Sequence, residues 1–69
     1  MKALCTFKND SSPIGLRKDQ NYEIIFAENL ENHRVVVNTI RGRLEYAGWA
    51  DFYQHWHVET TLDGTAMPD

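Results

Sequence analysis

The stretch "RVVVNTIRGRLEY", residues 34–46, decides the fold of this 69-residue chain. Its three consecutive valines carry stiff β-branched side chains, which fit a strand better than a helix. We therefore predict a strand over residues 34–40. Arg41 and Gly42 follow where a tight hairpin turn is needed, and residues 43–46 form the returning strand. The stretch predicts an antiparallel hairpin in the second half of the chain.

Two more strands are predicted before this hairpin. "KALCTFK", residues 2–8, alternates in side-chain character, and "NYEIIFAE", residues 21–28, is rich in aromatic and β-branched residues. Each places one set of side chains on a single face: Ala3, Cys5 and Phe7 in the first, and Tyr22, Ile24 and Phe26 in the second. The stretch "NDSSPIG" between them is rich in turn-forming residues, so we predict a loop that extends to Gln20.

The last third of the chain contains a short helical segment and a final strand. "ADFYQHW", residues 50–56, is too short for an independent helix and predicts a single helical turn. "HVETTL", residues 57–62, predicts the last strand, and "DGTAMPD", residues 63–69, has the composition of a loose tail. We therefore predict one domain over residues 1–62 and a flexible tail over residues 63–69.

The composition is that of a soluble globular domain, with 42% hydrophobic and 25% charged residues. Cys5 is the only cysteine, which excludes an intrachain disulfide and argues against a secreted, disulfide-stapled scaffold. The first apolar run is interrupted at Lys8 and is too short for a signal peptide or a membrane span. We expect a cytoplasmic protein with no membrane partner.

The order of the predicted elements resembles an SH3-like barrel. "ALCTF" stands where SH3 domains carry their opening Ala-Leu-Tyr motif, "LRKDQNYEII" resembles the segment before their second strand, and "GWADFYQHWHVE" is similar to their closing Gly-Tyr-x-Pro-x-x-Tyr-Val stretch. The likeness runs from Lys2 to Glu59. It implies an all-β fold, a small five-stranded SH3-like barrel with one short helical turn before the last strand.

The chain departs from SH3 domains where those domains bind polyproline. Such ligands dock between exposed aromatic rings. Cys5 replaces the first aromatic of the opening motif, residues 34–37 lack paired tryptophans, and "GWADFYQ" contains no proline. The resemblance therefore implies a fold and not a ligand. The chain also resembles short bacterial and phage proteins that begin Met-Lys-x-x-Cys.

The stretch "FYQHWHVE", residues 52–59, holds the candidate chemistry. His55 and His57 are two residues apart, which on a strand would place two zinc ligands on one face. A third ligand would have to come from His33, Cys5 or Asp51, and the usual spaced pairs of ligands are missing. We predict neither a metal nor a cofactor. We also predict no enzyme activity, because Cys5 reads as a small core residue with no orienting partner.

The same stretch supplies the candidate binding residues. On a helical turn Trp49, Phe52 and Trp56 fall on one side, and we expect Phe52 and at least one tryptophan to join the core. The remaining aromatics would be free for contact. The predicted partner-binding residues are Tyr53, Trp56 and His55, together with Arg41 at the hairpin turn. The loop around Pro13 is a second candidate surface.

These features predict a non-catalytic protein-binding module. The net charge of −3 argues against a surface that binds phosphates, so a protein partner is the leading hypothesis. By its resemblance to phage proteins, the chain would be a phage or mobile-element accessory protein that modulates a host protein. Two alternatives stay open, a nucleic-acid-binding SH3-like barrel and a self-associating structural protein.

Overall fold

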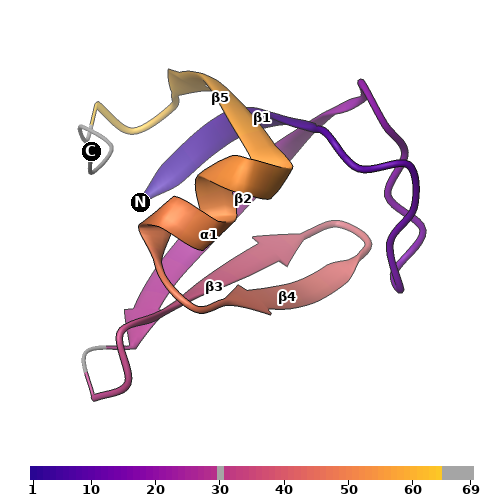
Figure 1. Ribbon diagram of the computed structural model, residues 1–69. Coiled ribbons are helices and arrows are strands. Elements are labelled where there is room, and N and C mark those ends of the chain that lie inside the picture. The colour runs from indigo at the N-terminus through magenta and orange to yellow at the C-terminus, as the bar shows by residue number, and fades with distance from the viewer. Residues whose placement is uncertain (30, 65–69) are drawn as a thin grey trace.

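The computed structural model describes residues 1–29 and 31–64 (Figure 1). Five strands and one helix follow in the order β1 (Lys2–Phe7), β2 (Asn21–Asn29), β3 (Arg34–Thr39), β4 (Gly42–Tyr46), α1 (Trp49–His55) and β5 (Trp56–Thr61). Every predicted strand is present, with its ends within one residue of the predicted ones. In place of the predicted single helical turn over residues 50–56, the chain forms a helix of seven residues, about two turns, which begins and ends one residue earlier.

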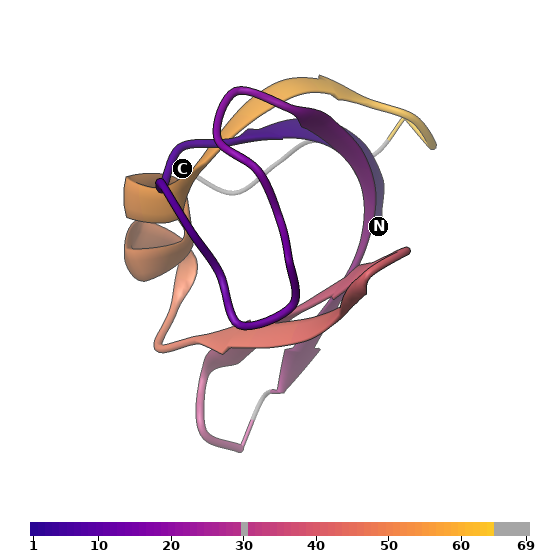
Figure 2. The ribbon, with the colours of Figure 1, turned by 90° about the vertical axis from the view of Figure 1, so that its right-hand side faces the viewer.

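The strands form one antiparallel sheet in the order β4-β3-β2-β1-β5. The long strand β2 serves two partners, because its first half pairs with β1 and its second half pairs with β3. Ile25 is the residue that pairs on both sides, with Lys2 of β1 and Asn38 of β3. A sheet whose central strand changes partner in this way curls strongly, as Figure 2 shows.

The closed barrel that we expected is not confirmed. Within the described part of the chain, the edge strands β4 and β5 are hydrogen-bonded to β3 and β1 and not to each other. The chain between these edges forms α1, which lies beside the open side of the curled sheet (Figure 2). The structure therefore establishes a mostly β protein with five antiparallel strands in one unclosed sheet and one short helix.

The core occupies the concave side of the sheet, where alternate residues of each strand meet α1. Phe7 and Trp56 come from neighbouring strands, and their ring centroids are 4.9 Å apart. Phe52 of α1 packs edge-on against Phe26 of β2, with 5.1 Å between the centroids. The faces predicted for the first two strands are buried at Ala3, Cys5, Phe7, Ile24 and Phe26, and Tyr22 is partly buried. The core also contains these buried side chains: Val35, Val37, Phe52 and Trp56.

The turn between β3 and β4, predicted at Arg41 and Gly42, lies one residue earlier: it is a two-residue loop formed by Ile40 and Arg41, because Thr39 pairs with Gly42. The Thr39 hydroxyl accepts hydrogen bonds from the backbone N–H groups of Arg41, at 3.0 Å, and Gly42, at 3.2 Å. Gly42 has φ +146°, and a Cβ there would lie 3.2 Å from Cγ2 of Ile14 in the β1–β2 loop. Glycine therefore allows both the turn and the close approach of that loop.

The two ends of the described chain lie close together. The backbone N–H of Lys2 donates a hydrogen bond to Oδ2 of Asp63, at 2.9 Å. The rest of the predicted tail falls largely on residues 65–69, outside the described residues. No helix in the described part of the chain has the length and apolar character that crossing a membrane requires.

Candidate functional site

Trp56 is a core residue. Only 1% of its surface is exposed, and its indole Nε1–H donates a buried hydrogen bond of 2.9 Å to the hydroxyl of Tyr46. The partly exposed tryptophan is Trp49, at the start of α1. A partner cannot reach the Trp56 ring without opening the core, so we leave Trp56 out of the contact surface proposed below.

His55, the last residue of α1, contacts side chains of the helix, of β4 and of the β1–β2 loop. Its Nδ1 lies 2.7 Å from the side-chain Nδ2 of Asn9, which can donate to it, and its Nε2 lies 3.6 Å from Oδ1 of Asp51. The ring also stacks on Tyr46, with centroids 5.4 Å apart. Burial raises the pKa of Tyr46, and the nearby Asp51 adds to that effect, while the hydrogen bond from Trp56 opposes it. His55 is thus held by structural contacts on several sides.

The expectation that His55 and His57 share one face of a strand is wrong. The helix ends at His55 and β5 begins at Trp56, so only His57 lies on the strand. His57 is exposed, with its Nε2 3.6 Å from Oε1 of Glu59. Among residues 1–29 and 31–64, no three histidine, cysteine or acidic side chains are grouped closely enough to hold a metal ion.

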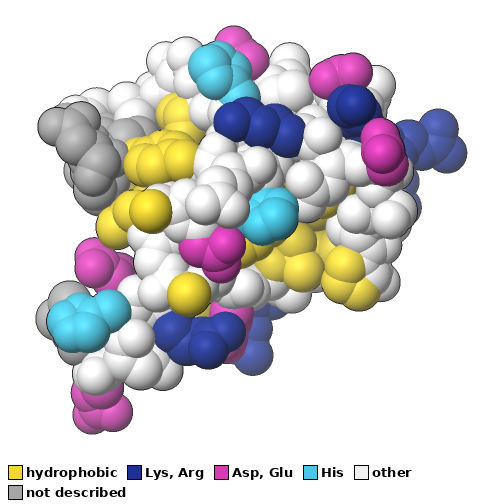
Figure 3. Space-filling model, viewed as in Figure 1, with side chains coloured by type: hydrophobic (Ala, Val, Ile, Leu, Met, Phe, Trp, Pro, Cys, Tyr) yellow, Lys and Arg dark blue, Asp and Glu magenta, His cyan; other side chains and the backbone are white. Residues whose placement is uncertain are grey.

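Tyr53 is half-buried on α1. Its ring packs against Phe52, at 5.3 Å between centroids, and against Trp49, at 6.2 Å. Its backbone carbonyl accepts a hydrogen bond of 2.8 Å from Nζ of Lys8. In the view from the α1 side, hydrophobic side chains form small patches separated by polar, charged and histidine side chains (Figure 3). This side of the molecule therefore offers an interrupted apolar surface.

The structure does not bring Arg41 to the other predicted residues. Arg41 is exposed in the β3–β4 turn, and β4 runs from that turn to Tyr46, close to the start of α1. Five residues of strand cover roughly 13 Å from first to last, so the turn and the start of α1 lie at opposite ends of β4. Tyr53 and His55 share α1, whereas Arg41 belongs to another surface.

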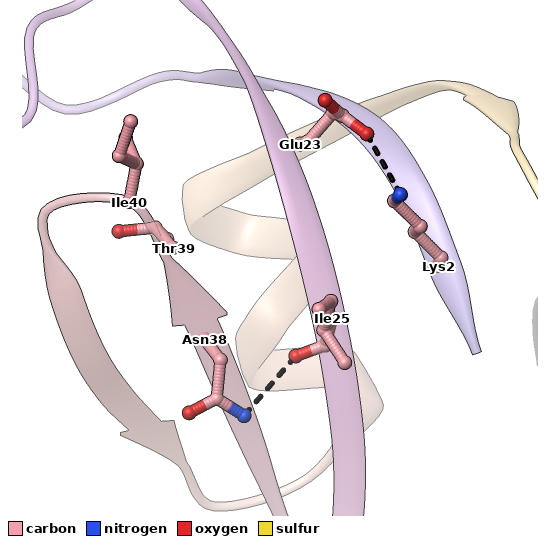
Figure 4. Close-up of a pocket in the computed structure, with 6 residues that line it drawn as sticks. All are labelled: Lys2, Glu23, Ile25, Asn38, Thr39 and Ile40. Atoms are coloured by element: carbon pink, nitrogen blue, oxygen red, sulfur yellow. Dashed lines mark hydrogen bonds and ion pairs between the residues drawn. The ribbon is translucent and has the colours of Figure 1, made fainter.

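The surface near Arg41 contains a pocket on the side of the sheet that faces away from α1 (Figure 4). It has a volume of about 340 Å³ and opens widely to solvent. We call it the outer pocket. Its lining residues come from β1, β2, β3 and the hairpin turn: Lys2, Glu23, Ile25, Asn38, Thr39 and Ile40.

The outer pocket combines exposed apolar walls with polar groups that already have partners. Ile40 is 92% exposed and Ile25 is 56% exposed. Nζ of Lys2 lies 3.1 Å from Oε1 of Glu23 in an ion pair, and the amide Nδ2 of Asn38 donates to the carbonyl of Ile25 at 3.2 Å. The pocket can therefore accept an apolar group, while its rim stays hydrated and polar.

The thiol of Cys5 is buried and favours its protonated form. Burial raises the pKa of Cys5 to about 12, and the negative charge of Glu59 contributes to the increase. Because the thiolate is the reactive form, the thiol stays protonated and inert near neutral pH. Cys5 packs in the core as a small apolar side chain.

Ile25 and Ile40 were not among the residues predicted to bind a partner. Ile25 stands between Ile24 and Phe26, whose side chains point into the core, so its own side chain had to point outward. Ile40 directly precedes the predicted turn. These signals place each isoleucine outside the core, but only the strand register places both at one pocket.

Comparisons with known proteins found no relative of this chain. No protein-family model, no curated protein and no solved structure matches it.

Proposed function

We propose that this protein is a non-catalytic protein-binding module whose contact surface is the outer pocket. The observation that carries the proposal is the 92% exposure of Ile40 at the tip of a tight turn. Turns favour Gly, Asn, Asp and Ser because these residues suit the backbone geometry and hydration of the site. A β-branched hydrocarbon side chain at this position does nothing for the turn or the core, so we infer that it serves a contact.

The position of Ile25 strengthens this reading. Single exposed apolar side chains are common on protein surfaces, but apolar side chains grouped around a concavity and edged by polar groups are typical of binding sites. Ile25 and Ile40 belong to different elements and line the same pocket. A partner side chain placed between them would remove both from water, which is the main source of affinity at such contacts.

The SH3-like interpretation also belongs to this proposal. The long loop between β1 and β2, the tight β3–β4 turn and the helix before β5 support it. SH3-like folds host many functions, so the fold by itself does not identify the ligand. Modulation of a host protein by a phage-like accessory protein stays a prediction.

An affinity capture experiment tests the proposal. Tagged full-length protein is exposed to bacterial lysate, with and without nuclease and at two salt concentrations. The same experiment uses an Ile25→Thr, Ile40→Ser variant, which keeps a β-branched residue in β2. Leu62→Ser is the matched control, because Leu62 is 45% exposed and does not line the outer pocket.

We expect a protein to be captured in the presence of nuclease and at high salt, and to be lost with the double isoleucine variant alone. Equal capture by the wild type and this variant would contradict the proposed surface. Capture that needs nucleic acid or low salt would favour the nucleic-acid alternative, because phosphate-led binding weakens strongly with salt. Both variants must first show the wild-type circular dichroism spectrum.

A further inference from the structure

Two arginines beside the outer pocket have no charged partner in the part of the chain that the structure describes. Within residues 1–29 and 31–64, three other basic side chains form ion pairs: Lys2 with Glu23, Lys18 with Asp10 and Arg34 with Glu45. Arg41 and Arg43 are exposed and form no ion pair with any described residue. The β3–β4 hairpin therefore carries two positive charges, in the turn and at the start of β4, that no described residue neutralises.

Each of the two arginines neighbours a residue that lines the pocket. Arg43 of β4 is paired in register with Asn38 of β3, and Asn38 lines the outer pocket. Residues paired across two strands project from the same face of the sheet, so Arg43 projects from the face that holds the pocket. Arg41 directly follows Ile40 in the turn. An occupant of the pocket would meet hydrocarbon and guanidinium groups together.

We propose that the outer pocket binds an acidic segment of a partner protein. An apolar side chain of that segment lies between Ile25 and Ile40, and Asp or Glu residues flanking it contact Arg41 and Arg43. The guanidinium group suits this role because its planar fork of N–H donors matches the two oxygens of a carboxylate. This inference rests on the proposed function and names the chemistry of its partner.

The charge near the outer pocket determines its preference for carboxylates, although the whole chain has a net charge of −3. The Debye length is about 8 Å at physiological ionic strength, so acidic groups elsewhere on the surface are largely screened. At the pocket itself, Lys2 and Glu23 neutralise each other and leave the two arginines in excess. The attraction for carboxylates is therefore short-ranged and confined to this patch.

The same face is less suited to nucleic acid. A protein held by phosphates typically makes about 6–10 phosphate contacts, which require a continuous basic surface. Here carboxylates alternate with the basic groups: Glu23 at the pocket rim is exposed, and Glu45 of β4 projects from the same face as Arg43. Glu23 is paired with Lys2 and Glu45 with Arg34, so beyond the two arginines this face offers no excess positive charge to a longer phosphate backbone.

The test uses three synthetic peptides of about ten residues, each with one central leucine flanked by Glu, Gln or Lys. Each peptide is titrated into isotope-labelled full-length protein, and backbone amide shifts are followed by NMR. We expect the Glu peptide to shift the amides of Ile25, Ile40 and Arg43. It should bind roughly 2- to 30-fold more tightly than the Gln peptide, because two exposed ion pairs contribute about 0.2–1 kcal/mol each, and the preference should shrink with added salt.

Charge reversal supplies the decisive comparison. The Arg41→Glu, Arg43→Glu variant should lose the preference for the Glu peptide and bind the Lys peptide more tightly instead. Lys8→Glu is the control for a change of charge away from the pocket, because Nζ of Lys8 donates to the backbone carbonyl of Tyr53 on α1, on the other side of the sheet. That control should keep the wild-type preference.

The outcomes separate this inference from the proposed function. If the Ile25→Thr, Ile40→Ser variant loses all peptide binding while the arginine reversal leaves the order of affinities unchanged, the pocket binds protein but the acidic partner is wrong. If the isoleucine variant binds every peptide as the wild type does, both proposals fail at this surface. The acidic inference is also overturned if the Glu peptide does not bind up to about 1 mM.

Binding of either of two other ligands at the outer pocket would also overturn the acidic inference. Tighter binding of a single-stranded DNA oligonucleotide than of the Glu peptide, lost on arginine reversal, would assign the patch to phosphates. Self-association of the wild type that the isoleucine variant abolishes, measured by analytical ultracentrifugation, would assign the pocket to a second copy of the chain.

Discussion

The hydrogen bond between Trp56 and Tyr46 allows a sharp test of the core, through the substitution Tyr46→Phe. Phenylalanine keeps the ring that contacts Phe52, at 5.9 Å, and His55, at 5.4 Å, and removes only the hydroxyl. The Nε1–H of Trp56, on a side chain that is 1% exposed, then has no acceptor. A buried donor left without a partner costs about 1–3 kcal/mol.

That loss is large for a domain of this size, whose total unfolding free energy is expected to be about 3–10 kcal/mol. Urea unfolding followed by tryptophan fluorescence measures it. With an m-value of about 1 kcal/mol/M, the midpoint should fall by about 1–3 M, and the melting temperature should fall by at least about 4 °C. Equal m-values for the two proteins would show that only stability has changed.

Tyr22→Phe is the matched control. The Tyr22 hydroxyl accepts a hydrogen bond of 3.0 Å from the backbone N–H of Arg17, and both groups lie where water can replace the lost partner. We expect this control to lose no more than about 0.5 kcal/mol. A loss for Tyr46→Phe as small as that of the control would refute the reasoning, because it would mean that the indole N–H finds water or another acceptor.

Two further predictions concern the hairpin turn and the buried thiol. Gly42→Ala should destabilise the protein by about 1–3 kcal/mol in urea unfolding, because the new side chain has to accept a φ of +146° and a close contact with Ile14. Gly15→Ala should destabilise it less, because φ there is +80° and nothing lies near the new Cβ. Equal losses for the two would show that the contact with Ile14 is unimportant. Burial raises the pKa of Cys5 from 9.0 to about 12, so the stability it contributes is complete below pH 9.0 and falls as the pH rises toward 12. By about pH 10 the loss of unfolding free energy should reach roughly 1.4 kcal/mol. The Cys5→Ala variant should flatten the dependence of unfolding free energy on pH, measured by unfolding across that range. If the variant shows the same pH dependence as the wild type, other groups cause the loss of stability at alkaline pH.

The strands could be predicted from the sequence because their side chains alternate clearly. Ala3, Cys5 and Phe7 are buried as the alternation required, and the valines of residues 35–37 form the strand that their branching favours. The hairpin turn was predicted at Arg41 and Gly42 and lies one residue earlier, at Ile40 and Arg41, because Gly42 already pairs with Thr39. Predictions from such local patterns succeed where the local preference of the residues agrees with the tertiary structure around them.

The parts that failed depend on contacts distant in sequence. The spacing of Trp49 and Trp56 could not show which ring the core would accept, because that choice depends on the position of Tyr46 across the sheet. His55 and His57 were separated because the helix continues to His55. The outer pocket exists only in the folded register, where Ile25 stands between Lys2 and Asn38.

The pairing of the edge strand β5 with β1, at the other end of the chain, has a consequence for the order of folding. The β3–β4 hairpin closes a two-residue loop, and such hairpins form in about 1–10 μs. Pairing of β1 with β5 joins Phe7 to Trp56, far apart in the chain, and must first offset the entropy of closing that long loop. We therefore expect β2, β3 and β4 to organise first, and the docking of β1 and β5 to set the folding rate.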